Sequence, residues 1–219
     1  GILVFGTPTL LLLGYDFTTT LSFLLPASWS IAFLQVFNFK SRRPRIPASL
    51  YILCLPFVGI GLLLSESAPL VSSLTNIIGA TLIMSAVIRY WEPAQCYFSA
   101  MLNRNMAAYH VIMGLVHGIT NLGGALLAVF ASEIHTDKDK VRYVVAYYYC
   151  AFNSIQILVL AIIIEHIELM IAHAFTAIVS SGIYVSVGNR IFNAVSSQFF
   201  ANILTIFILF YGCVILTQK

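Results

Sequence analysis

A few polar side chains lie inside long apolar stretches of this sequence, and they are the groups that could do chemistry. His117 directly precedes Gly118, and Gln35 and Gln156 each lie within a mainly apolar run. A primary amide in hydrocarbon must be hydrogen-bonded, so the two glutamines either line a polar path or join helices. His117 is either a neutral core histidine or a group that binds an anion or carries a proton.

Hydroxyl and amide side chains are frequent in the same stretches. Each serine or threonine has a structural explanation, because it can bond to the preceding helical turn. Amides, hydroxyls and exposed backbone N–H groups suit an anion, whereas no carboxylate lies deep within an apolar run to form a cation site. We therefore expect a substrate-binding set for a small anion: Gly6, Thr7, Pro8, Ser28, Ser30, Gln35, His117, Asn121, Gly123, Gly124, Asn153 and Gln156.

Glycine and proline interrupt two of the apolar stretches, at Gly6-Thr7-Pro8 and between Gly118 and Gly124. Small residues let helices pack closely, which is one explanation. The other is that helices break near the middle of a membrane, so that helix N-termini and free N–H groups face a bound anion. Recurrence at corresponding places in both halves of the chain favours the second explanation.

Other chemistries lack their reactive groups. The sequence has no HExxH, GxSxG or P-loop motif, so a protease, lipase or ATP-driven pump is not expected, and we predict neither an enzyme nor a bound cofactor. His110 and His117 are seven residues apart, as are His166 and His173, but no carboxylate or cysteine completes a metal-ligand set. The four cysteines show no CxxC spacing and are interpreted as thiols within helices.

Membrane helices are the elements that must position these residues. Of the 219 residues, 60% are hydrophobic and 9% charged, and the mean hydropathy is +0.94. Soluble domains are roughly half apolar and a quarter charged. The net charge of +3 comes from cations near the ends of apolar blocks, which is typical of juxtamembrane positions. We therefore expect the lipid bilayer and a small anionic substrate as partners, and no nucleic acid.

Eight apolar segments predict an all-α integral membrane protein with about 7–8 membrane segments. Between the fourth and the fifth, Tyr90 to Ala107 combines aromatic and charged residues and is typical of an interfacial stretch. The eight segments are residues 1–14, 17–37, 49–64, 72–89, 108–131, 142–164, 168–187 and 197–216.

The second half of the chain aligns with the first in the same order. Gln35 aligns with Gln156 and Gly61 with Gly182, and Gly6-Thr7-Pro8 faces Gly123-Gly124-Ala125 if four extra residues are allowed near 136–140. This order predicts two homologous four-segment repeats, residues 1–107 and 108–219, with the substrate site at their interface. Because Gly1 already lies inside an apolar run, we interpret the N-terminus of the first repeat as incomplete.

Two topologies distribute the Lys and Arg residues differently. If all eight segments cross, seven cations share one side with Lys40 and four share the other with Lys138. If segment 108–131 instead enters and returns as two glycine-rich half-helices, ten of the eleven share one side and the repeats are inverted. We prefer this re-entrant topology by the positive-inside rule, although 24 residues are also enough for a plain crossing.

The stretches from Gly6 to Gln35 and from His117 to Gln156 resemble the sulfite exporter TauE/SafE family of membrane permeases. The first copy reads GTPTLLLLGYDFTTTLSFLLPASWS, followed by FKSRRPRIP, and the second reads GLVHGITNLGGALLAVF, with Ala125 at the family's proline position. The resemblance covers essentially the whole chain. It implies a duplicated multi-helix permease of the bacterial inner membrane that moves small sulfur-containing or organic anions.

These observations predict a secondary permease that moves a small anion, such as sulfite or an organosulfonate, by alternating access, driven by the anion's gradient or coupled to protons. Two alternatives stay open. One is a non-transporting membrane scaffold or accessory subunit that binds a partner through its helices. The other is an intramembrane metal-dependent enzyme that uses His110, His117, His166 and His173.

Overall fold

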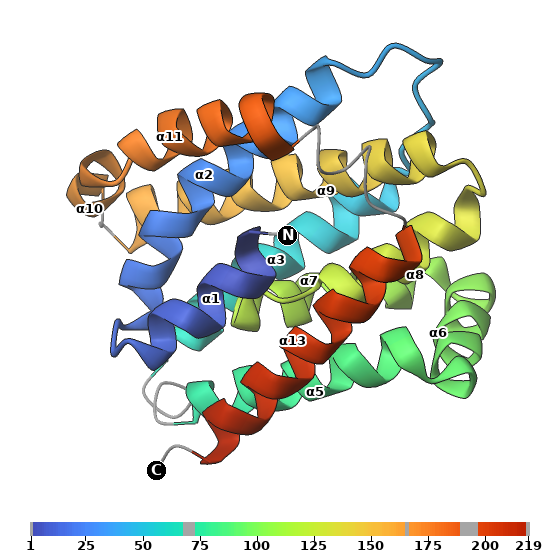
Figure 1. Ribbon diagram of the computed structural model, residues 1–219, viewed down its shortest axis with the longest axis horizontal. Coiled ribbons are helices and arrows are strands. Elements are labelled where there is room, and N and C mark those ends of the chain that lie inside the picture. The colour runs from blue at the N-terminus through green and yellow to red at the C-terminus, as the bar shows by residue number, and fades with distance from the viewer. Residues whose placement is uncertain (1, 68–72, 165–166, 189–196, 218–219) are drawn as a thin grey trace.

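The computed structural model is all-helical over the residues that it describes, 2–67, 73–164, 167–188 and 197–217 (Figure 1). Three short π-helical segments, η1 to η3, continue or precede α-helices. In chain order the elements are α1 (Ile2–Leu12), α2 (Phe17–Phe37), η1 (Leu50–Cys54), α3 (Leu55–Ser65), α5 (Leu74–Tyr90), α6 (Glu92–Arg104), α7 (Met106–Thr120), α8 (Gly124–Ile134), α9 (Lys138–Leu158), η2 (Val159–Ile163), α10 (Ile167–Ala172), α11 (Phe175–Ile183), η3 (Tyr184–Gly188) and α13 (Ser197–Thr217).

Three of the described helices are long and apolar enough to cross a membrane: Phe17–Phe37, Lys138–Ile163 and Ile167–Gly188. Helices α5 and α6 would make a fourth span together, but the chain bends by 95° between them. The shorter apolar helices, which have 10–17 residues, are Ile2–Leu12, Leu50–Ser65, Met106–Thr120, Gly124–Ile134 and the Asn202–Thr217 part of α13. The described residues therefore carry three or four candidate spans, whereas the sequence predicts seven or eight segments.

The predicted interruption within segment 108–131 is present. Helix α7 ends at Thr120, and the next residue, Asn121, adopts a left-handed conformation with φ of 59° and donates its N–H to His117 O over 2.7 Å. Asparagine tolerates this conformation better than most residues. The chain then folds back, because the hydroxyl of Tyr109 reaches the carbonyl of Leu126 over 2.7 Å. Helices α7 and α8 thus form a V-shaped hairpin.

The predicted interruption at Gly6-Thr7-Pro8 was wrong, because these residues lie within the continuous helix α1. A Cβ at Gly6 would lie 2.5 Å from the Leu24 side chain, so this glycine allows α1 to pack closely on α2. Helices α1 and α8 both have 11 residues, and α2 and α9 both have 21.

Helix α2 runs antiparallel to α9. Phe39, just beyond α2, packs on Tyr143 near the start of α9 with 4.6 Å between ring centroids, whereas Phe17 at the other end of α2 shares a core cluster with Leu160. Helix α11 lies on α2, and α3 lies on α9. Helix α1 packs on α2, and α8 packs on α9. Helices α2 and α9 thus form a central antiparallel pair, with α1 and α11 on α2 and with α8 and α3 on α9.

Helix α5 likewise runs antiparallel to α13, the last segment of the second half. Arg89 donates to the hydroxyl of Thr205 over 3.3 Å, and Gly79 lies against Leu216. Helix α13 also packs on α1, where Phe5 and Phe207 have ring centroids 4.2 Å apart, and α5 packs on α8.

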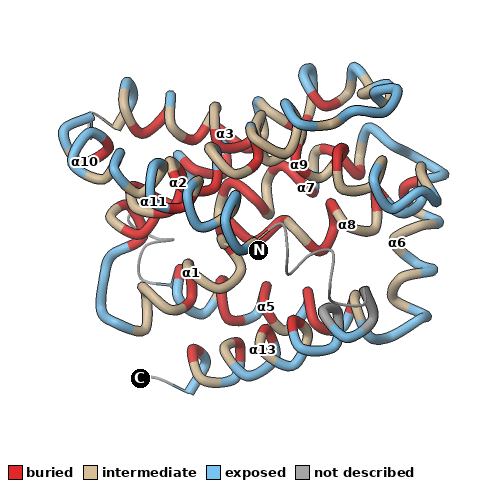
Figure 2. The backbone as a smooth tube through the Cα atoms, turned by 45° about the horizontal axis from the view of Figure 1, so that its top comes forward, coloured by how far each residue is buried: buried red, intermediate tan, exposed pale blue. Residues whose placement is uncertain are grey.

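The buried residues form two clusters, which occupy the middle of the helical layers (Figure 2). Helix α7 is held against α3 by glycine. A Cβ at Gly61 would lie 3.0 Å from the Cα of Gly118, and Gly114 approaches the carbonyl of Cys54. Backbone-to-backbone packing of this kind is typical of helices that associate in membranes.

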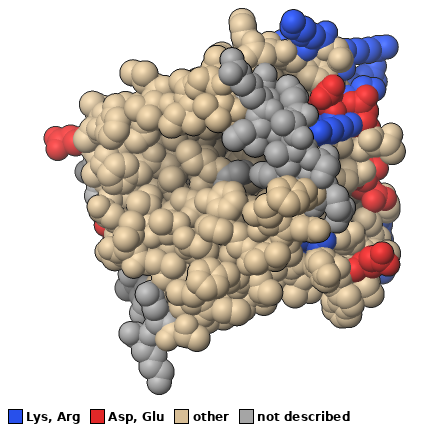
Figure 3. Space-filling view, in the orientation of Figure 1, with Lys and Arg blue, Asp and Glu red and all other residues tan. Residues whose placement is uncertain are grey.

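Charged side chains gather toward the ends of the molecule. In the view of Figure 3 the visible Lys and Arg atoms lie at one end, together with some acidic atoms, while the broad middle is free of charge. The basic turn that follows α2 lies at this end beside the start of α9, because Phe39 packs on Tyr143. Glu133, near the end of α8, accepts hydrogen bonds from Ser99 and Asn103 of α6.

Candidate functional site

The break between α7 and α8 lies against α1. The amide nitrogen of Asn121 donates to the hydroxyl of Thr7 over 3.3 Å, and both residues are fully buried. A Cβ at Gly124 would lie 4.0 Å from the Val4 side chain. The start of α8 therefore meets the middle of α1 inside the protein.

His117 faces this break from the last turn of α7. The backbone N–H of Gly123 donates to its Nδ1 over 3.3 Å. Because Nδ1 accepts, the neutral ring carries its hydrogen on Nε2. Nε2 is fully buried and has no hydrogen-bond partner among the described residues. The ring packs against Phe152 at 4.6 Å and Tyr149 at 5.9 Å between centroids. It thus presents an unused N–H donor in a dry environment.

Gln156 of α9 lies beside the same ring. Its side chain is fully buried and lies within reach of the His117 ring, but neither its amide nitrogen nor its amide oxygen makes a hydrogen bond of standard geometry within the part of the chain that is described. One turn earlier in α9, the amide nitrogen of Asn153 donates to the Ser28 hydroxyl of α2 over 2.8 Å. The amide oxygen of Asn153 has no hydrogen-bond partner among the described residues. The oxygen of Asn121 is likewise unpartnered among described residues.

Unused polar atoms in a protein interior are costly, at about 1–3 kcal/mol each, so several in one place indicate a ligand site. The start of α8 adds to them. No side chain caps this helix at Gly123, and the first N–H groups of any α-helix have no partner within the helix. The helix dipole also places partial positive charge there. The donors among these groups, His117 Nε2–H, the Gln156 amide nitrogen and the first N–H groups of α8, can hold a small anion that accepts hydrogen bonds, whereas the oxygens of Asn121 and Asn153 cannot.

The two glycines at this break, Gly123 and Gly124, have a packing role. A Cβ at Gly123 would lie 2.7 Å from the Cβ of His117, and a Cβ at Gly124 would collide with the hydroxyl of Tyr149. Side chains at these positions would push His117 and Tyr149 away from the helix start. Glycine therefore keeps the donors of the site together.

Not all of the predicted residues come together here. Ser30 points instead toward α11, where its hydroxyl lies 3.2 Å from both Ala177 O and the Ser180 hydroxyl. Gln35 is half-buried near the end of α2. Gly6 lines a separate apolar groove. Pro8 is buried within α1. The structure thus brings Thr7, His117, Asn121, Gly123 and Gly124 together at the break with Gln156 beside His117, while Ser28 and Asn153 bond to each other between α2 and α9.

Three residues of this region were not predicted from the sequence. Tyr149 and Phe152 flank His117, and a signal for them existed, because they share one face of a helix with Asn153 and Gln156. Arg89, at the end of α5, is partly buried and close enough to Tyr149 for its positive charge to act on the neutral hydroxyl of that residue. Arg89 thus supplies a positive charge near the start of α8.

The other histidines have different surroundings. His110 Nε2 lies 2.8 Å from the Tyr148 hydroxyl and its Nδ1 2.9 Å from Met106 O, so both ring nitrogens are bonded. His173 lies 2.7 Å from the Ser22 hydroxyl. His166 lies outside the described residues. No group of three or more potential metal ligands occurs within the described residues, so the metal-enzyme alternative gains no structural support.

Comparisons with known proteins identify no relative: no family model, curated protein or solved structure matches this chain.

Proposed function

We propose that this protein is a secondary membrane permease that carries a small anion, such as sulfite or an organosulfonate, by alternating access through the site at the start of α8. The observation that carries the proposal is the pairing of buried, unpartnered donors with an uncapped helix start. His117 Nε2 and the Gln156 amide are such donors, and α8 begins beside them without a side-chain cap.

The charges around the site support a singly charged anion. Arg89 contributes one positive charge near Tyr149, and a helix N-terminus acts as roughly half a positive charge. Sulfite protonated once and methanesulfonate each carry a single negative charge and several acceptor oxygens. A doubly charged anion such as sulfate would leave uncompensated charge in an apolar interior, which is costly. We therefore expect monoanions to bind in preference to dianions of similar size.

The helices of the two halves pack in matching pairs: α1 on α2 as α8 on α9, α11 on α2 as α3 on α9, and α13 on α1 as α5 on α8. This pattern supports two inverted four-segment repeats, 1–107 and 108–219. Helices α1, α2, α3 and α5 of the first correspond to α8, α9, α11 and α13 of the second. Since α2 and α9 are antiparallel, as are α5 and α13, the two copies run in opposite directions. The site then lies where the copies meet, which is where inverted-repeat transporters bind their substrates.

The V-shaped hairpin of α7 and α8 supports the re-entrant topology. In this topology the basic turn after α2 and the start of α9 share the cytoplasmic side, consistent with the contact of Phe39 with Tyr143. Helix α6, bent by 95° from α5, would lie along that interface. The full burial of His117, Asn121 and Gln156 then corresponds to an occluded state, which must open to each side in turn.

The runner-up is a non-transporting membrane scaffold or accessory subunit. Exposed apolar side chains on α11, such as Ile178 and Val179, are the observation that favours it. The scaffold needs no anion site, whereas the permease does. Anion binding at the break therefore separates the two.

Thermal unfolding of the detergent-purified protein with added anions tests the proposal. A ligand at 100 times its Kd stabilises the folded state by about 2.7 kcal/mol. We expect sulfite and methanesulfonate to raise the melting temperature, and sulfate at equal ionic strength to raise it less. Gln156→Leu should remove the effect, and Gln35→Leu, the matched control, should keep it. An equal response in Gln156→Leu would reject the site.

A further inference from the structure

The basic turn that follows α2, residues 38–45, carries positive charge with no negative charge of its own. Four exposed cations lie in it: Lys40, Arg42, Arg43 and Arg45. No Asp or Glu occurs anywhere between Asp16 and Glu66. The cations at the start of α9 differ, because Lys138 and Lys140 alternate with acidic residues. The basic turn is therefore a concentrated site of charge that an anionic group can neutralise.

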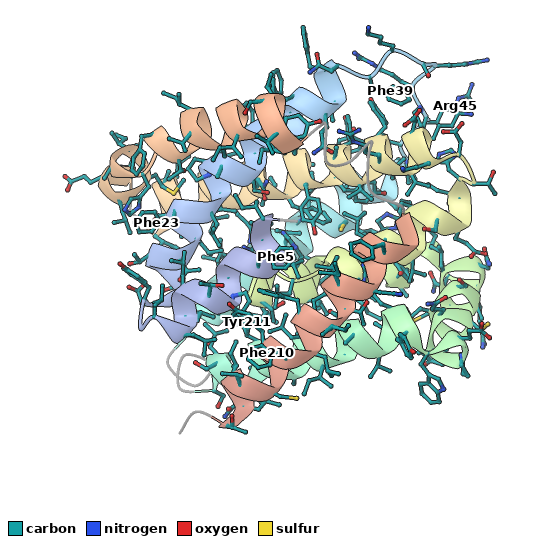
Figure 4. The ribbon with its side chains drawn as sticks, viewed as in Figure 1. Phe5, Phe23, Phe39, Arg45, Phe210 and Tyr211 are labelled. Carbon is teal, nitrogen blue, oxygen red and sulfur yellow. The ribbon has the colours of Figure 1, made fainter. Side chains whose placement is uncertain are left out.

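The fold holds this turn in place. Phe39 packs on Tyr143 near the start of α9 with 4.6 Å between ring centroids, and Arg43 is close enough for its charge to act on the same tyrosine. Pro44 restricts the backbone between Arg43 and Arg45. Figure 4 labels Phe39 and Arg45, which lie at the end of the molecule beyond α2. The four cations are thus presented together at one end of the helical layers.

An exposed aromatic stripe on α2, which we call the aromatic lane, leads to this turn. It consists of Trp29, Phe33 and Phe37, which are 36%, 46% and 69% exposed. Their rings stack in series, with centroid distances of 5.1 and 6.1 Å. The indole N–H of Trp29 donates to the Ser154 hydroxyl over 3.0 Å, so the polar atom of the lane already has a partner. The lane therefore offers apolar ring surface to its surroundings.

The length of the lane matches one leaflet of a membrane. Eight residues separate Trp29 from Phe37, which is about 12 Å at 1.5 Å per residue. One leaflet contains roughly 15 Å of hydrocarbon, half of a 30 Å core. With the basic turn at the headgroups, the lane runs from that level toward the middle of the bilayer, as a lipid acyl chain does.

We propose that the basic turn and the aromatic lane together bind one anionic phospholipid, with its phosphate on the cations and an acyl chain along the lane. Charge complementarity selects this lipid, because clusters of four or more Lys and Arg beside a membrane helix attract anionic headgroups, and arginine can bind phosphate through two parallel hydrogen bonds. A zwitterionic lipid makes the same apolar contact without the net charge. The proposal requires that α2 lies in a membrane, but it does not depend on anion transport.

Quenching of Trp29 fluorescence by brominated lipids tests this assignment. In Trp91→Phe, Trp29 is the single tryptophan, and bromine on the acyl chain of a bound lipid quenches it. The protein is placed in phosphatidylcholine liposomes that contain rising fractions of brominated phosphatidylglycerol or brominated phosphatidylcholine. We expect half-maximal quenching by the phosphatidylglycerol at a fraction at least about tenfold lower, and a smaller difference at high ionic strength.

Matched variants separate a defined site from general attraction of anionic lipid. Arg42→Gln combined with Arg43→Gln should bring the two lipids close to equal, since each removed charge weakens binding about fivefold. Lys138→Gln combined with Lys140→Gln removes the same charge from the same end and should keep the preference.

A second reporter gives the positional control. Trp29→Phe leaves Trp91, at the bend between α5 and α6 and 60% exposed, which should show a much smaller preference. Equal quenching of Trp29 by the two lipids, equal losses in the two double variants, or an equal preference at Trp91 would overturn the proposal. Because no transport is measured, a failure of the permease proposal leaves this result unaffected.

Discussion

The backbone N–H of Gly123 donates a hydrogen bond to Nδ1 of His117 over 3.3 Å, across the break between α8 and α7. This bond places the hydrogen of the neutral imidazole on Nε2, which is buried and unpartnered among described residues. A hydrogen bond from such a donor to a charged acceptor contributes about 1.5–3 kcal/mol. In the proposed site, the hydrogen bond from Gly123 therefore determines which nitrogen of His117 can donate to an anion.

Replacing His117 by phenylalanine keeps a ring between Tyr149 and Phe152 but removes the donor. We expect anion affinity to fall about 10- to 100-fold, which corresponds to the loss of one such bond. Titration of melting temperature with methanesulfonate measures this change. His110→Phe serves as the control, because it alters a bonded histidine outside the site and should leave the affinity unchanged. Equal losses in both variants would contradict the assigned role of His117.

Arg89 should set the charge preference of the site. Arg89→Gln removes the positive charge near Tyr149, so binding of methanesulfonate should weaken. Arg89→Lys keeps the charge and should retain most of the affinity, although it loses the Nε donor to Thr205. Isothermal titration of the two variants makes the comparison. Affinity that is equally reduced in both would indicate a structural role for this residue.

The re-entrant topology makes a prediction about loop orientation. Ser41→Cys and Asp139→Cys should react with a membrane-impermeant thiol reagent from the same side, and Tyr15→Cys from the opposite side. The reagent is added outside sealed vesicles before or after permeabilisation, in a chain without other cysteines. If segment 108–131 crosses the membrane once, Ser41→Cys and Asp139→Cys will instead react from opposite sides.

Asp16 should make the start of α2 sensitive to acid. Partial burial acts to raise the pKa of Asp16, but hydrogen bonds from the hydroxyl and backbone N–H of Thr19 outweigh it and lower the pKa below its usual value. A lowered folded pKa gives stability above the unfolded pKa, and this stability is lost as pH falls through the folded value.

Asp16→Ala should therefore destabilise the protein by about 1 kcal/mol at neutral pH and by less below the folded pKa of Asp16. Thermal melting of the wild type and the variant across this range checks the difference. A cost that stays constant into acid would show that the carboxylate charge does not contribute.

The sequence predicts some parts of this architecture well, because they depend on local properties. The length and apolar content of 17–37 and 142–164 define α2 and α9, and the glycines after Gly118 mark the break before α8. The continuity of α1 through Gly6-Thr7-Pro8 was not predicted, since its glycine serves the contact with Leu24. Contacts between distant segments are not visible in local sequence patterns.

Within the site, too, residues that stand out locally are predictable from the sequence, whereas contacts between distant segments are not. His117, Asn153 and Gln156 are predictable because polar groups stand out in apolar helices. The approach of Arg89 to Tyr149 depends on how α5 packs near α9, and the turn of Ser30 toward α11 depends on which face of α2 is covered. These relationships are set by tertiary packing.

Uptake of radiolabelled sulfite into proteoliposomes tests the central claim most directly. The account predicts saturable uptake by the wild-type protein, its loss in folded Gln156→Leu, and its retention in Gln35→Leu, whose side chain lies apart from the break. Uptake by Gln156→Leu equal to that of the wild type would contradict the site. Wild-type uptake no greater than that of protein-free liposomes would contradict transport of this anion.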